Sequence, residues 1–428
     1  MSDINYLKRL FKAYYKEKSS EIPSLSSFEN REFGYIPWDT KTFMKRHMSF
    51  KVQEQFLTHL INEGPRHIYS SGAIYKQPEN QNMEGKEYQG CDFIIDIDVD
   101  HFYTPCKEDH DFWYCKECGE SGVGMVHSCP NCKKLKIKTL AWICDRCLET
   151  AKREIIKLIY NFLIPDFGID LSNMKIAFSG HRGYHLKIEN QQIRKLTSSE
   201  RREIADYIAG ENISLELLGL QEKSGTFYSF SGDTYGWAQK IIRKISVLLK
   251  KSDLELRDLL LNKENFNFSK NYVKGFMNSK QDFINKIENH NTFALPSVEG
   301  FGLANWKKFF NGIIHEVGVE IDTPVTIDIH RLIRYPGSLH GKTGFKTQEI
   351  LPDELDDFNP LDEINKKLDP IVFESKVHTT QKVEILEKQV PATKIKGKSY
   401  GPYTQGEIIE VPHHIAVFLL CKEVAKTI

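Results

Sequence analysis

The chain has 428 residues, of which 40% are hydrophobic, so it can bury at least one large core and still carry appended modules. Lysine and arginine balance aspartate and glutamate at 58 each, which excludes a protein that holds a polyanion through net charge alone. The N-terminus is polar, and the longest apolar run, residues 415–421, is far shorter than the roughly 20 residues of a membrane helix. We therefore expect a cytoplasmic protein with no membrane partner, whose contacts with nucleic acid are local or shared with a partner protein.

Short apolar runs bounded by turn or charged residues predict strands at residues 92–98, 174–178, 184–188 and 325–329. Between the first two runs, an apolar stripe over residues 148–163 predicts a helix that Pro165 brings to an end. Strands interleaved with helices indicate an α/β or α+β core.

Helical patterns dominate from about residue 190 to 300, beginning with the capping-box pattern Thr197-Ser-Ser-Glu200 and stopping near Gly210. This stretch predicts a helical subdomain inserted in the core. After Pro370 the chain is polar and lysine-rich through Tyr400, as in a flexible connector, and then ends in an apolar segment at 408–425. The expected organisation is a core in two parts, 1–190 and 301–370, with the helical subdomain at 191–300, a connector and C-terminal segment at 371–428, and a metal-binding insertion at about 104–148.

Acidic residues occupy alternate positions in the first predicted strand. Alternation puts Asp96, Asp98 and Asp100 on one face, about 6 to 7 Å apart, where like charges repel unless a cation compensates. Hard carboxylate oxygens suit Mg²⁺ or Mn²⁺, although a solvated strand face would carry the same pattern. Asp328, in the predicted strand at 325–329, adds a third carboxylate, and three such groups could hold the two cations of a phosphoryl-transfer site.

Two glycine-containing segments carry side chains that bind phosphate. Residues 178–185 offer Ser179, Arg182 and His185 between two predicted strands, although a hairpin turn with incidental polar residues would look the same. Residues 328–344 follow the third carboxylate and are broken by Pro336 and several glycines. Their cationic and hydroxyl side chains, which match a triphosphate, are Arg331, Arg334, Ser338, His340 and Lys342.

Seven of the nine cysteines fall between Cys106 and Cys147, mostly as Cys-x-x-Cys pairs, which indicates metal binding rather than disulfides. One set has the spacing of a zinc ribbon and consists of Cys115, Cys118, Cys129 and Cys132. The other candidate ligands also make a set of four, namely Cys106, His110, Cys144 and Cys147. Two structural zinc ions are therefore predicted, with His127 as a competing ligand and other pairings left open.

The motifs Asp96-Ile-Asp98, Ser179-Gly-His-Arg-Gly-Tyr-His185 and Asp328 with residues 334–344 resemble, in order and spacing, the three active-site motifs of archaeal and eukaryotic primase small subunits. The resemblance extends over residues 28–350 and is closer to the archaeal proteins. It implies the primase catalytic core fold, with zinc ligands arranged as in the set of Cys106, His110, Cys144 and Cys147. In place of the arginine that many eukaryotic relatives have, this chain has His181.

Carried over position by position, the resemblance implies that Asp96, Asp98 and Asp328 bind the catalytic Mg²⁺ or Mn²⁺ ions. It further implies a set of residues that hold the incoming triphosphate, namely Ser179, Arg182, His185, Arg334, His340 and Lys342. Near the N-terminus, Glu32 and Arg46 match a segment in which an acid and an arginine reach the nucleotide site.

The function that the resemblance implies is template-directed synthesis of short primers on single-stranded DNA from nucleoside triphosphates, by two-metal nucleotidyl transfer. The expected partners are a primase large subunit, which would contribute initiation and DNA binding, and the replication machinery. One alternative is a stand-alone primase-polymerase of repair or replicon maintenance. Another is a zinc-stabilised nucleic-acid-binding protein without catalysis.

Overall fold

The computed structural model describes residues 3–39, 43–229, 235–262, 265–289, 294–375, 377 and 379–428. The chain forms two compact units. Unit 1 comprises Met1–Ile156, Asp170–Arg202 and Ile321–Ile428, and unit 2 comprises Lys157–Ile169 and Glu203–Glu320. In the described part of the chain, no helix is both long enough and apolar enough to cross a membrane.

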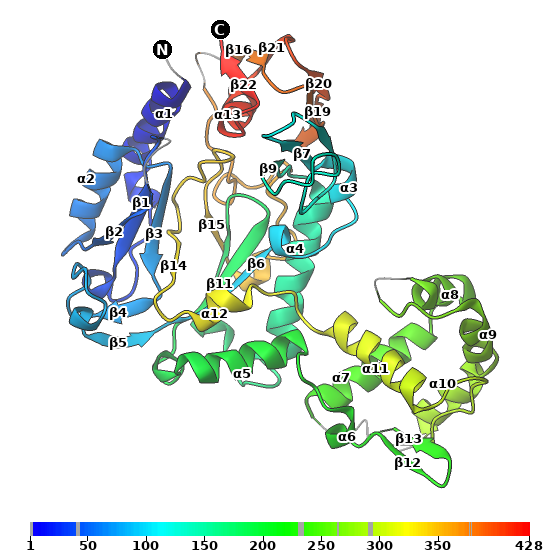
Figure 1. Ribbon diagram of the computed structural model, residues 1–428. Helices are drawn as coiled ribbons and strands as arrows, with labels where there is room; N and C mark the ends of the chain where they lie inside the picture. Colours follow the sequence, from blue (N-terminus) through cyan, green and yellow to red (C-terminus); the bar gives the residue numbers. More distant parts are fainter. Residues whose placement is uncertain are drawn as a thin grey trace. The chain divides into compact units, whose positions relative to one another are not determined.

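The first sheet of unit 1 has four antiparallel strands in the order β14, β3, β1, β2. Their bounds are Leu332–Arg334, His67–Ser71, Phe33–Ile36 and Lys45–Met48. The helices α1 (Asp3–Glu17) and α2 (Gln53–Glu63) lie beside this sheet in Figure 1. Their buried apolar side chains join those of β1 and β3 in one core, because each helix has one apolar stripe.

The second sheet of unit 1 is also antiparallel, in the order β15, β10, β11, β6. Its strands are Gln348–Ile350, Met174–Phe178, Gly183–Ile188 and Phe93–Asp98. The register of β11 against β6 places His185 opposite Asp96 and Gly183 opposite Asp98. Three of the strands expected from the sequence are thereby confirmed, and their pairing brings two predicted motifs together.

The prediction of a fourth strand at 325–329 is wrong. These residues belong mainly to the short helix α12 (Thr323–Ile327), which has Pro324 in its first turn, Asp322 as its N-cap and Asp328 as its C-cap. An apolar run of this length has no decisive period, and proline at the start of a helix removes no hydrogen bond. The following strand, β14, begins only at Leu332.

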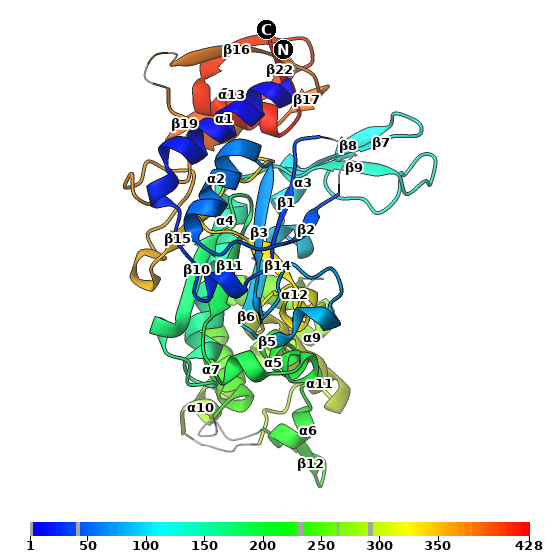
Figure 2. The same ribbon diagram turned by 90° about the vertical axis from the view of Figure 1, so that its left-hand side faces the viewer.

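Helix α4 (Asp145–Leu158) begins earlier than the sequence predicted and ends in a π-helical turn, Ile159–Leu163. Before it, three short strands form a sheet in the order β8, β7, β9, which extends away from the rest of unit 1 in Figure 2. Their bounds are Ser121–Val123, Phe112–Cys115 and Ile137–Leu140. Buried Trp113, Cys115 and Cys129 form a small core of their own. We call residues 112–140, which contain this core and the three strands, the ribbon.

The C-terminal part of unit 1 contains regular structure where a flexible connector was expected, so that expectation is wrong. The sheet in the order β21, β16, β22 consists of Ile408–Pro412, Thr380–Ile385 and Ala425–Thr427. Two further strand pairs are Gln389–Val390 with Tyr403–Thr404 and Thr393–Ile395 with Lys398–Tyr400. Single buried residues such as Val383, Ile385 and Ile395 anchor these strands, which the many lysines obscured.

Helix α13 (His413–Cys421) is buried from Ile415 onward and packs against α1. The two ends of the described chain lie together in Figure 2, where Thr427 donates from its backbone N–H and its hydroxyl to Asp3 Oδ1, at 3.0 and 2.6 Å. The C-terminal segment is therefore part of the unit 1 core.

Unit 2 is mainly helical. Its longer helices are α7 (Trp237–Leu249), α8 (Asp253–Leu261), α9 (Lys270–Asn278), α10 (Lys280–Asn289) and α11 (Leu303–Val317). Aromatic residues fill its interior, among them Phe276, Trp306 and Phe309. Helix α5 (Ser198–Ala209) starts at the expected capping box, in which Thr197 Oγ1 accepts from the Glu200 N–H and Glu200 accepts from the Thr197 N–H.

Candidate functional site

Two carboxylates of strand β6 lie in a buried, electrostatically unfavourable place. Burial raises the pKa of Asp96 well above its ordinary value, and the charges of Asp98 and Asp322 raise it further. Burial and the neighbouring Asp100 likewise raise the pKa of Asp98. Asp96 Oδ1 is buried and has no hydrogen-bond partner among the described residues, with His185 Nε2 3.5 Å away. An unpaired carboxylate oxygen among like charges fits a divalent cation ligand.

The third carboxylate beside this pair is Asp322 rather than Asp328. The backbone N–H of Asp322 donates to the carbonyl oxygen of Asp96 at 2.9 Å, and its Oδ2 lies 3.6 Å from His101 Nε2. Asp322 is the N-cap of α12, yet its side chain makes no capping hydrogen bond. An aspartate at an N-cap position ordinarily accepts a hydrogen bond from a backbone N–H of the first helical turn. Because the Asp322 carboxylate accepts no such bond, it is available to another partner.

Asp328, the residue expected from the sequence, lies at the other end of α12. Its Oδ1 accepts from the His330 N–H at 2.9 Å, and its charge acts on Cys91 at the end of β5 (Tyr88–Cys91). The two aspartates are only six positions apart in the sequence, and helix α12 between them places Asp322 next to β6. Nothing in the residue pattern alone distinguishes them.

A cavity of about 130 Å³ opens beside Asp96 and Asp98. Four of the predicted nucleotide-binding residues line it, namely Ser179, His185, Arg334 and His340. Strand pairing explains why these residues lie close together, because His185 is opposite Asp96 in one sheet and Arg334 is on β14 of the other sheet. Burial and the nearby Arg334 lower the pKa of His185 to about 3, so this imidazole is neutral beside the carboxylate.

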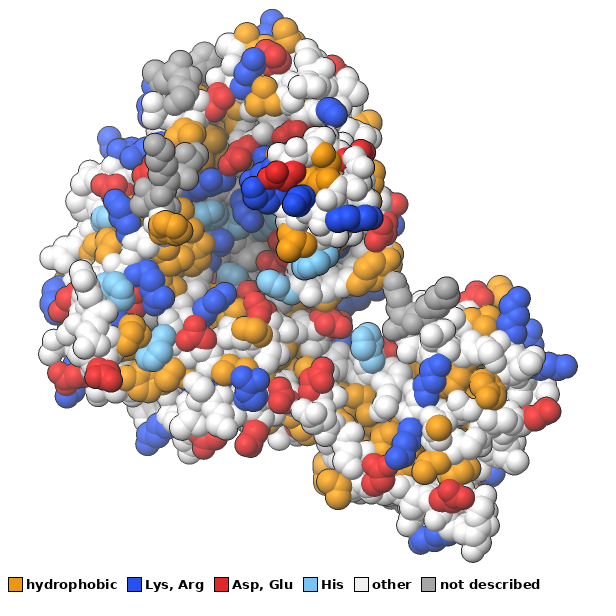
Figure 3. All heavy atoms as spheres, viewed as in Figure 1, with side chains coloured by type: hydrophobic (Ala, Val, Ile, Leu, Met, Phe, Trp, Pro, Cys, Tyr) orange, Lys and Arg blue, Asp and Glu red, His pale blue; other side chains and the backbone are white. Residues whose placement is uncertain are grey.

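His181 and His340 form one wall of this cavity, and His67 and Lys422 contact that wall without lining the cavity. The ring of His340 stacks on His181 at a centroid distance of 5.2 Å and meets His67 edge-on at 5.0 Å. Arg334 donates to His67 Nδ1 at 2.6 Å, and Lys422 donates to His181 Nε2 at 2.8 Å. Figure 3 shows histidine, lysine and arginine side chains gathered in a hollow of unit 1.

Burial lowers the pKa of His67, His181 and His340 well below the ordinary value, and the charges of Arg334 and Lys342 lower all three further. The charge of Lys422 also lowers the pKa of His181. Neutral imidazoles beside permanently charged cations form a wall that suits an anionic ligand. The sequence did not single out His67 or Lys422, because each reaches the site only through tertiary packing.

Three other predicted residues lie near the cavity without lining it. Lys342 is exposed, and its backbone N–H donates to His340 Nδ1 at 3.2 Å. Glu32 is buried and pairs with Arg46 at 2.9 Å, and Arg46 also donates to the carbonyl oxygen of His330 at 3.2 Å. Burial would raise the pKa of Glu32, but the Arg46 guanidinium brings it below the usual value.

Arg182 does not face the cavity, unlike the triphosphate ligand that the sequence predicted. Its side chain is buried, and NH1 donates to both oxygens of Asp111 at 2.8 and 2.9 Å and to the carbonyl oxygen of Trp142 at 2.9 Å. Nε donates to Asp100 Oδ1 at 2.7 Å, and NH2 bonds the same oxygen. The guanidinium is therefore committed to two aspartates of its own chain.

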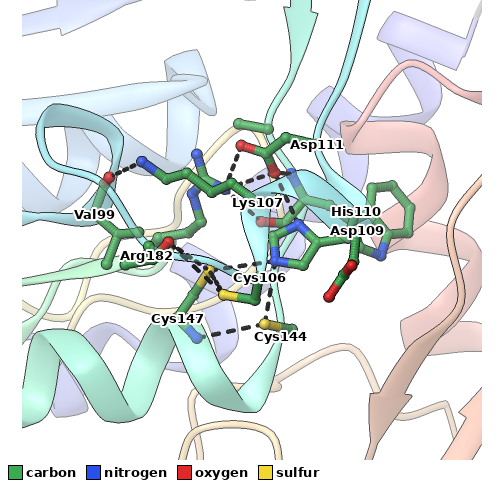
Figure 4. A network of polar contacts seen from close by, with 12 residues as sticks. Val99, Cys106, Lys107, Asp109, His110, Asp111, Cys144, Cys147 and Arg182 are labelled. Atoms are coloured by element: carbon green, nitrogen blue, oxygen red, sulfur yellow. Dashed lines mark hydrogen bonds and ion pairs between the residues drawn. The ribbon is translucent and has the colours of Figure 1, made fainter. Parts of the chain in front are cut away.

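Both predicted sets of metal ligands come together, and within each set the ligand atoms lie within 4.8 Å of one another. In the first set, Cys106 Sγ lies 3.3 Å from Cys147 Sγ, while His110 Nε2 lies 3.2 and 3.4 Å from the sulfurs of Cys144 and Cys147 (Figure 4). Tetrahedral zinc with sulfur ligands at about 2.3 Å separates them by about 3.8 Å, close to this spacing.

The second set lies in the ribbon. Its Cys115 and Cys132 sulfurs are 3.5 Å apart, and those of Cys118 and Cys129 are 3.6 Å apart. Among the described residues, His127 joins neither group. Sulfur and imidazole donors in complete sets of four fit a structural zinc ion, because no ligand position is left for a substrate.

Comparison with known proteins agrees with these motifs. The model of the family described as DNA primase small subunit matches residues 138–351. A DNA primase small subunit of Methanothrix thermoacetophila is 31% identical, with 98% of each chain covered. Those of Archaeoglobus fulgidus and Nitrosopumilus maritimus are 30% and 28% identical, covering 97% and 99% of this chain and 96% and 98% of the relatives. The chain belongs to the DNA primase small subunit family, as the resemblance of its motifs predicted.

Proposed function

We propose that this protein synthesises short primers on single-stranded DNA, joining nucleoside triphosphates by template-directed nucleotidyl transfer. The observation that carries the proposal is the cavity in which the buried carboxylates of Asp96 and Asp98 meet a wall of neutral histidines and cations. A reaction between a hydroxyl and a triphosphate needs both halves, a metal site for the reacting phosphorus and a cationic site for the leaving pyrophosphate.

Asp96, Asp98 and Asp322 are the residues that would hold Mg²⁺ or Mn²⁺. When bound, such ions favour attack of a 3′-hydroxyl on an α-phosphate and offset the charge of the leaving pyrophosphate. The proximity of Asp322 to Asp96, together with its unused capping position, supports Asp322 in place of Asp328 as the third ligand. His185 would stay neutral beside Asp96 and donate to a phosphate oxygen rather than neutralise the carboxylate.

The incoming triphosphate would lie along Ser179, His340 and Arg334, with Lys342 at the exposed rim. Arg334 supplies a planar, permanently charged donor set, and the neutral imidazoles supply N–H donors. Lys422 would support this wall from behind through His181. Glu32 and Arg46 lie next to the turn that carries His330 and would reach the nucleotide from the first sheet.

The partners would be a single-stranded DNA template, the replication machinery and a primase large subunit. A chain with 58 basic and 58 acidic residues has little net attraction for DNA, so template binding would be shared with that subunit. The two cysteine-containing sets would hold two structural zinc ions per chain, and elemental analysis of the purified protein tests this number. One zinc per chain would contradict it.

The decisive assay uses purified protein, a single-stranded template, labelled nucleotides and Mg²⁺ or Mn²⁺, with and without the large subunit. Asp96→Asn and Asp322→Asn are each expected to reduce synthesis by about 100-fold or more, the usual cost of losing one group that stabilises transition-state charge. Asp328→Asn is the matched control and should retain most of the activity. Equal losses in Asp322→Asn and Asp328→Asn would contradict the assignment of the third ligand.

The same assay separates the alternatives. Full primer synthesis without the large subunit would favour a stand-alone primase-polymerase. A chain that binds DNA but never incorporates nucleotides, under any combination of metal and subunit, would be a zinc-stabilised binding protein.

A further inference from the structure

A continuous chain of polar contacts joins the Cys106–His110–Cys144–Cys147 set to the carboxylates of β6. Figure 4 shows the first part of this chain, from the cysteines through His110 and Asp111 to Arg182. His110 turns Nε2 toward the cysteine sulfurs and Nδ1 toward Asp111 Oδ1, which is 2.9 Å away. Asp111 accepts two bonds from Arg182 NH1, and Arg182 Nε donates to Asp100 Oδ1 at 2.7 Å. The backbone N–H of Asp100 then donates to Asp98 Oδ1 at 2.9 Å.

The middle of this chain is shielded from water. Asp111 and Arg182 are 0% and 1% exposed, and Asp111 Oδ1 also accepts from the backbone N–H of Trp142 at 2.9 Å. A buried ion pair with satisfied hydrogen bonds holds its geometry firmly, because removing one partner leaves an uncompensated charge in a medium of low dielectric constant. Movement of Asp111 would therefore displace Arg182 rather than simply separate from it.

Arg182 holds the segment that follows Asp98 in two ways. Strand β6 ends at Asp98, and residues Val99–His101 form a single 3₁₀ turn. The carbonyl oxygen of Arg182 accepts from the Val99 N–H at 3.2 Å, while the Arg182 guanidinium donates hydrogen bonds to the Asp100 side chain. This turn orients the Asp98 carboxylate, because Asp98 Oδ1 accepts a hydrogen bond from the Asp100 N–H.

A second connection runs parallel to the first. Lys107 belongs to the short helix α3 (Lys107–His110), which also carries the ligand His110 and directly follows the ligand Cys106. Its buried ammonium donates to the carbonyl oxygens of Phe102, at 2.6 Å, and Val99. The segment that bears two of the four ligands is thus bonded to both ends of the turn after Asp98.

We propose that Arg182 is a positioning residue that links the Cys106–His110–Cys144–Cys147 set to Asp98, so that zinc in this set strengthens divalent-cation binding by the β6 carboxylates. With zinc on Nε2, His110 would keep its proton on Nδ1 and donate a hydrogen bond to Asp111 Oδ1, which would fix the carboxylate that Arg182 binds. Without it, the His110 ring and helix α3 lose their anchor, and the turn after Asp98 loosens. The proposal rests on the metal-binding role of Asp96 and Asp98 proposed above.

The proposal differs in a measurable way from a triphosphate-binding role for Arg182. Lysine keeps the positive charge of arginine but cannot bond Asp100 and Asp111 together with a planar fork. A positioning role therefore predicts that Arg182→Lys weakens binding of the divalent cation in the absence of any nucleotide. A role in triphosphate binding predicts no such effect.

The experiment measures Mn²⁺ binding to the full chain without nucleotide, by the electron paramagnetic resonance signal of free Mn²⁺, alongside the zinc content and circular dichroism of each variant. Asp96→Asn first establishes that the signal reports the β6 carboxylates. Arg182→Lys and Asp100→Asn should each weaken Mn²⁺ binding by about 10-fold, as loss of an outer partner of a metal ligand typically does, while two zinc ions are retained. Asp109→Asn, at an exposed position next to His110, is the matched control and should bind Mn²⁺ like the unaltered protein.

A second comparison tests the zinc itself. Cys144→Ser removes a ligand of the first set and should weaken Mn²⁺ binding, whereas Cys118→Ser in the ribbon should not. Unchanged Mn²⁺ affinity in both Arg182→Lys and Asp100→Asn would overturn the proposal. If Asp96→Asn left Mn²⁺ binding unchanged, the proposed catalytic metal site itself would be refuted, a result distinct from failure of the link.

Discussion

At the scale of single residues, Lys422 is a cation whose pKa depends on its burial in the fold. Its side chain is buried between the rings of Trp142 and Phe418, and it donates to His181 and to the carbonyl oxygen of Ala141. Burial lowers the pKa of Lys422 to about 7, and the charges of Arg182 and Lys342 act in the same direction against Asp100 and Asp111. The charge of this lysine therefore changes near neutral pH.

This titration predicts a pH dependence of nucleotide binding. Above pH 7 Lys422 loses its proton, so the wall behind His181 becomes less positive and the KM for nucleotide should rise, by about 5- to 10-fold between pH 6.5 and 8.5. Lys422→Met should show the high KM at both pH values, and Lys422→Arg should show the low KM at both. Steady-state kinetics with a preformed primer measure this, and a slope in Lys422→Met equal to that of the unaltered protein would contradict it.

At the scale of elements, the pairing of β6 with β11 brings the carboxylates and the phosphate-binding loop together. Gly183 faces Asp98 in this register, and a Cβ at that position would collide with the carbonyl oxygen of Ile97 and lie 3.0 Å from the Asp98 Cα. Both obstacles are backbone, which cannot rotate away as a flexible side chain can. The close approach of the two strands therefore requires glycine.

Gly183→Ala is accordingly expected to lower the free energy of unfolding by about 1 to 3 kcal/mol, the usual cost of overpacking, and to weaken Mn²⁺ binding because β11 is pushed away from Asp98. Urea denaturation and Mn²⁺ titration measure the two effects. Lys175→Ala, at an exposed position of the neighbouring strand β10, is the control and should change neither. Normal stability in Gly183→Ala would show that the strands can separate without cost.

The sequence predicted the elements whose pattern is strong and missed those that depend on tertiary context. Strands β6, β10 and β11 could be identified because they are short apolar runs bounded by turn or charged residues, and Cys-x-x-Cys spacing identified both ligand sets. Helix α12 was mistaken for a strand because its five residues have no clear period, and the third carboxylate was therefore expected at Asp328, whereas we propose Asp322. Arg182 was expected at the triphosphate because its motif shows only that an arginine is present, not which aspartates it meets.

At the scale of the whole molecule, the division into two units determines which part of the chain should respond to ligands. Every residue proposed to bind nucleotide, divalent cation or zinc belongs to unit 1, although these residues span positions 32 to 342. Unit 2 has its own aromatic core and its own network, in which Asp166 accepts from Lys240 and Tyr207 at 2.6 and 3.0 Å. Each unit therefore has the internal contacts of a separate cooperative element.

Differential scanning calorimetry should accordingly resolve two thermal transitions, because units with separate cores unfold as separate cooperative systems. Mg²⁺ with nucleotide at about 100 times its Kd should stabilise unit 1 by about 2.7 kcal/mol and raise its transition by about 5 °C, since only that unit binds the ligand. The transition of unit 2 should stay where it is. Lys240→Met, which leaves Asp166 without its cation, should lower the unit 2 transition alone. A single transition that nucleotide raised would mean that the two units unfold as one cooperative system, and the residues of unit 2 would then also contribute to the stability of the nucleotide site.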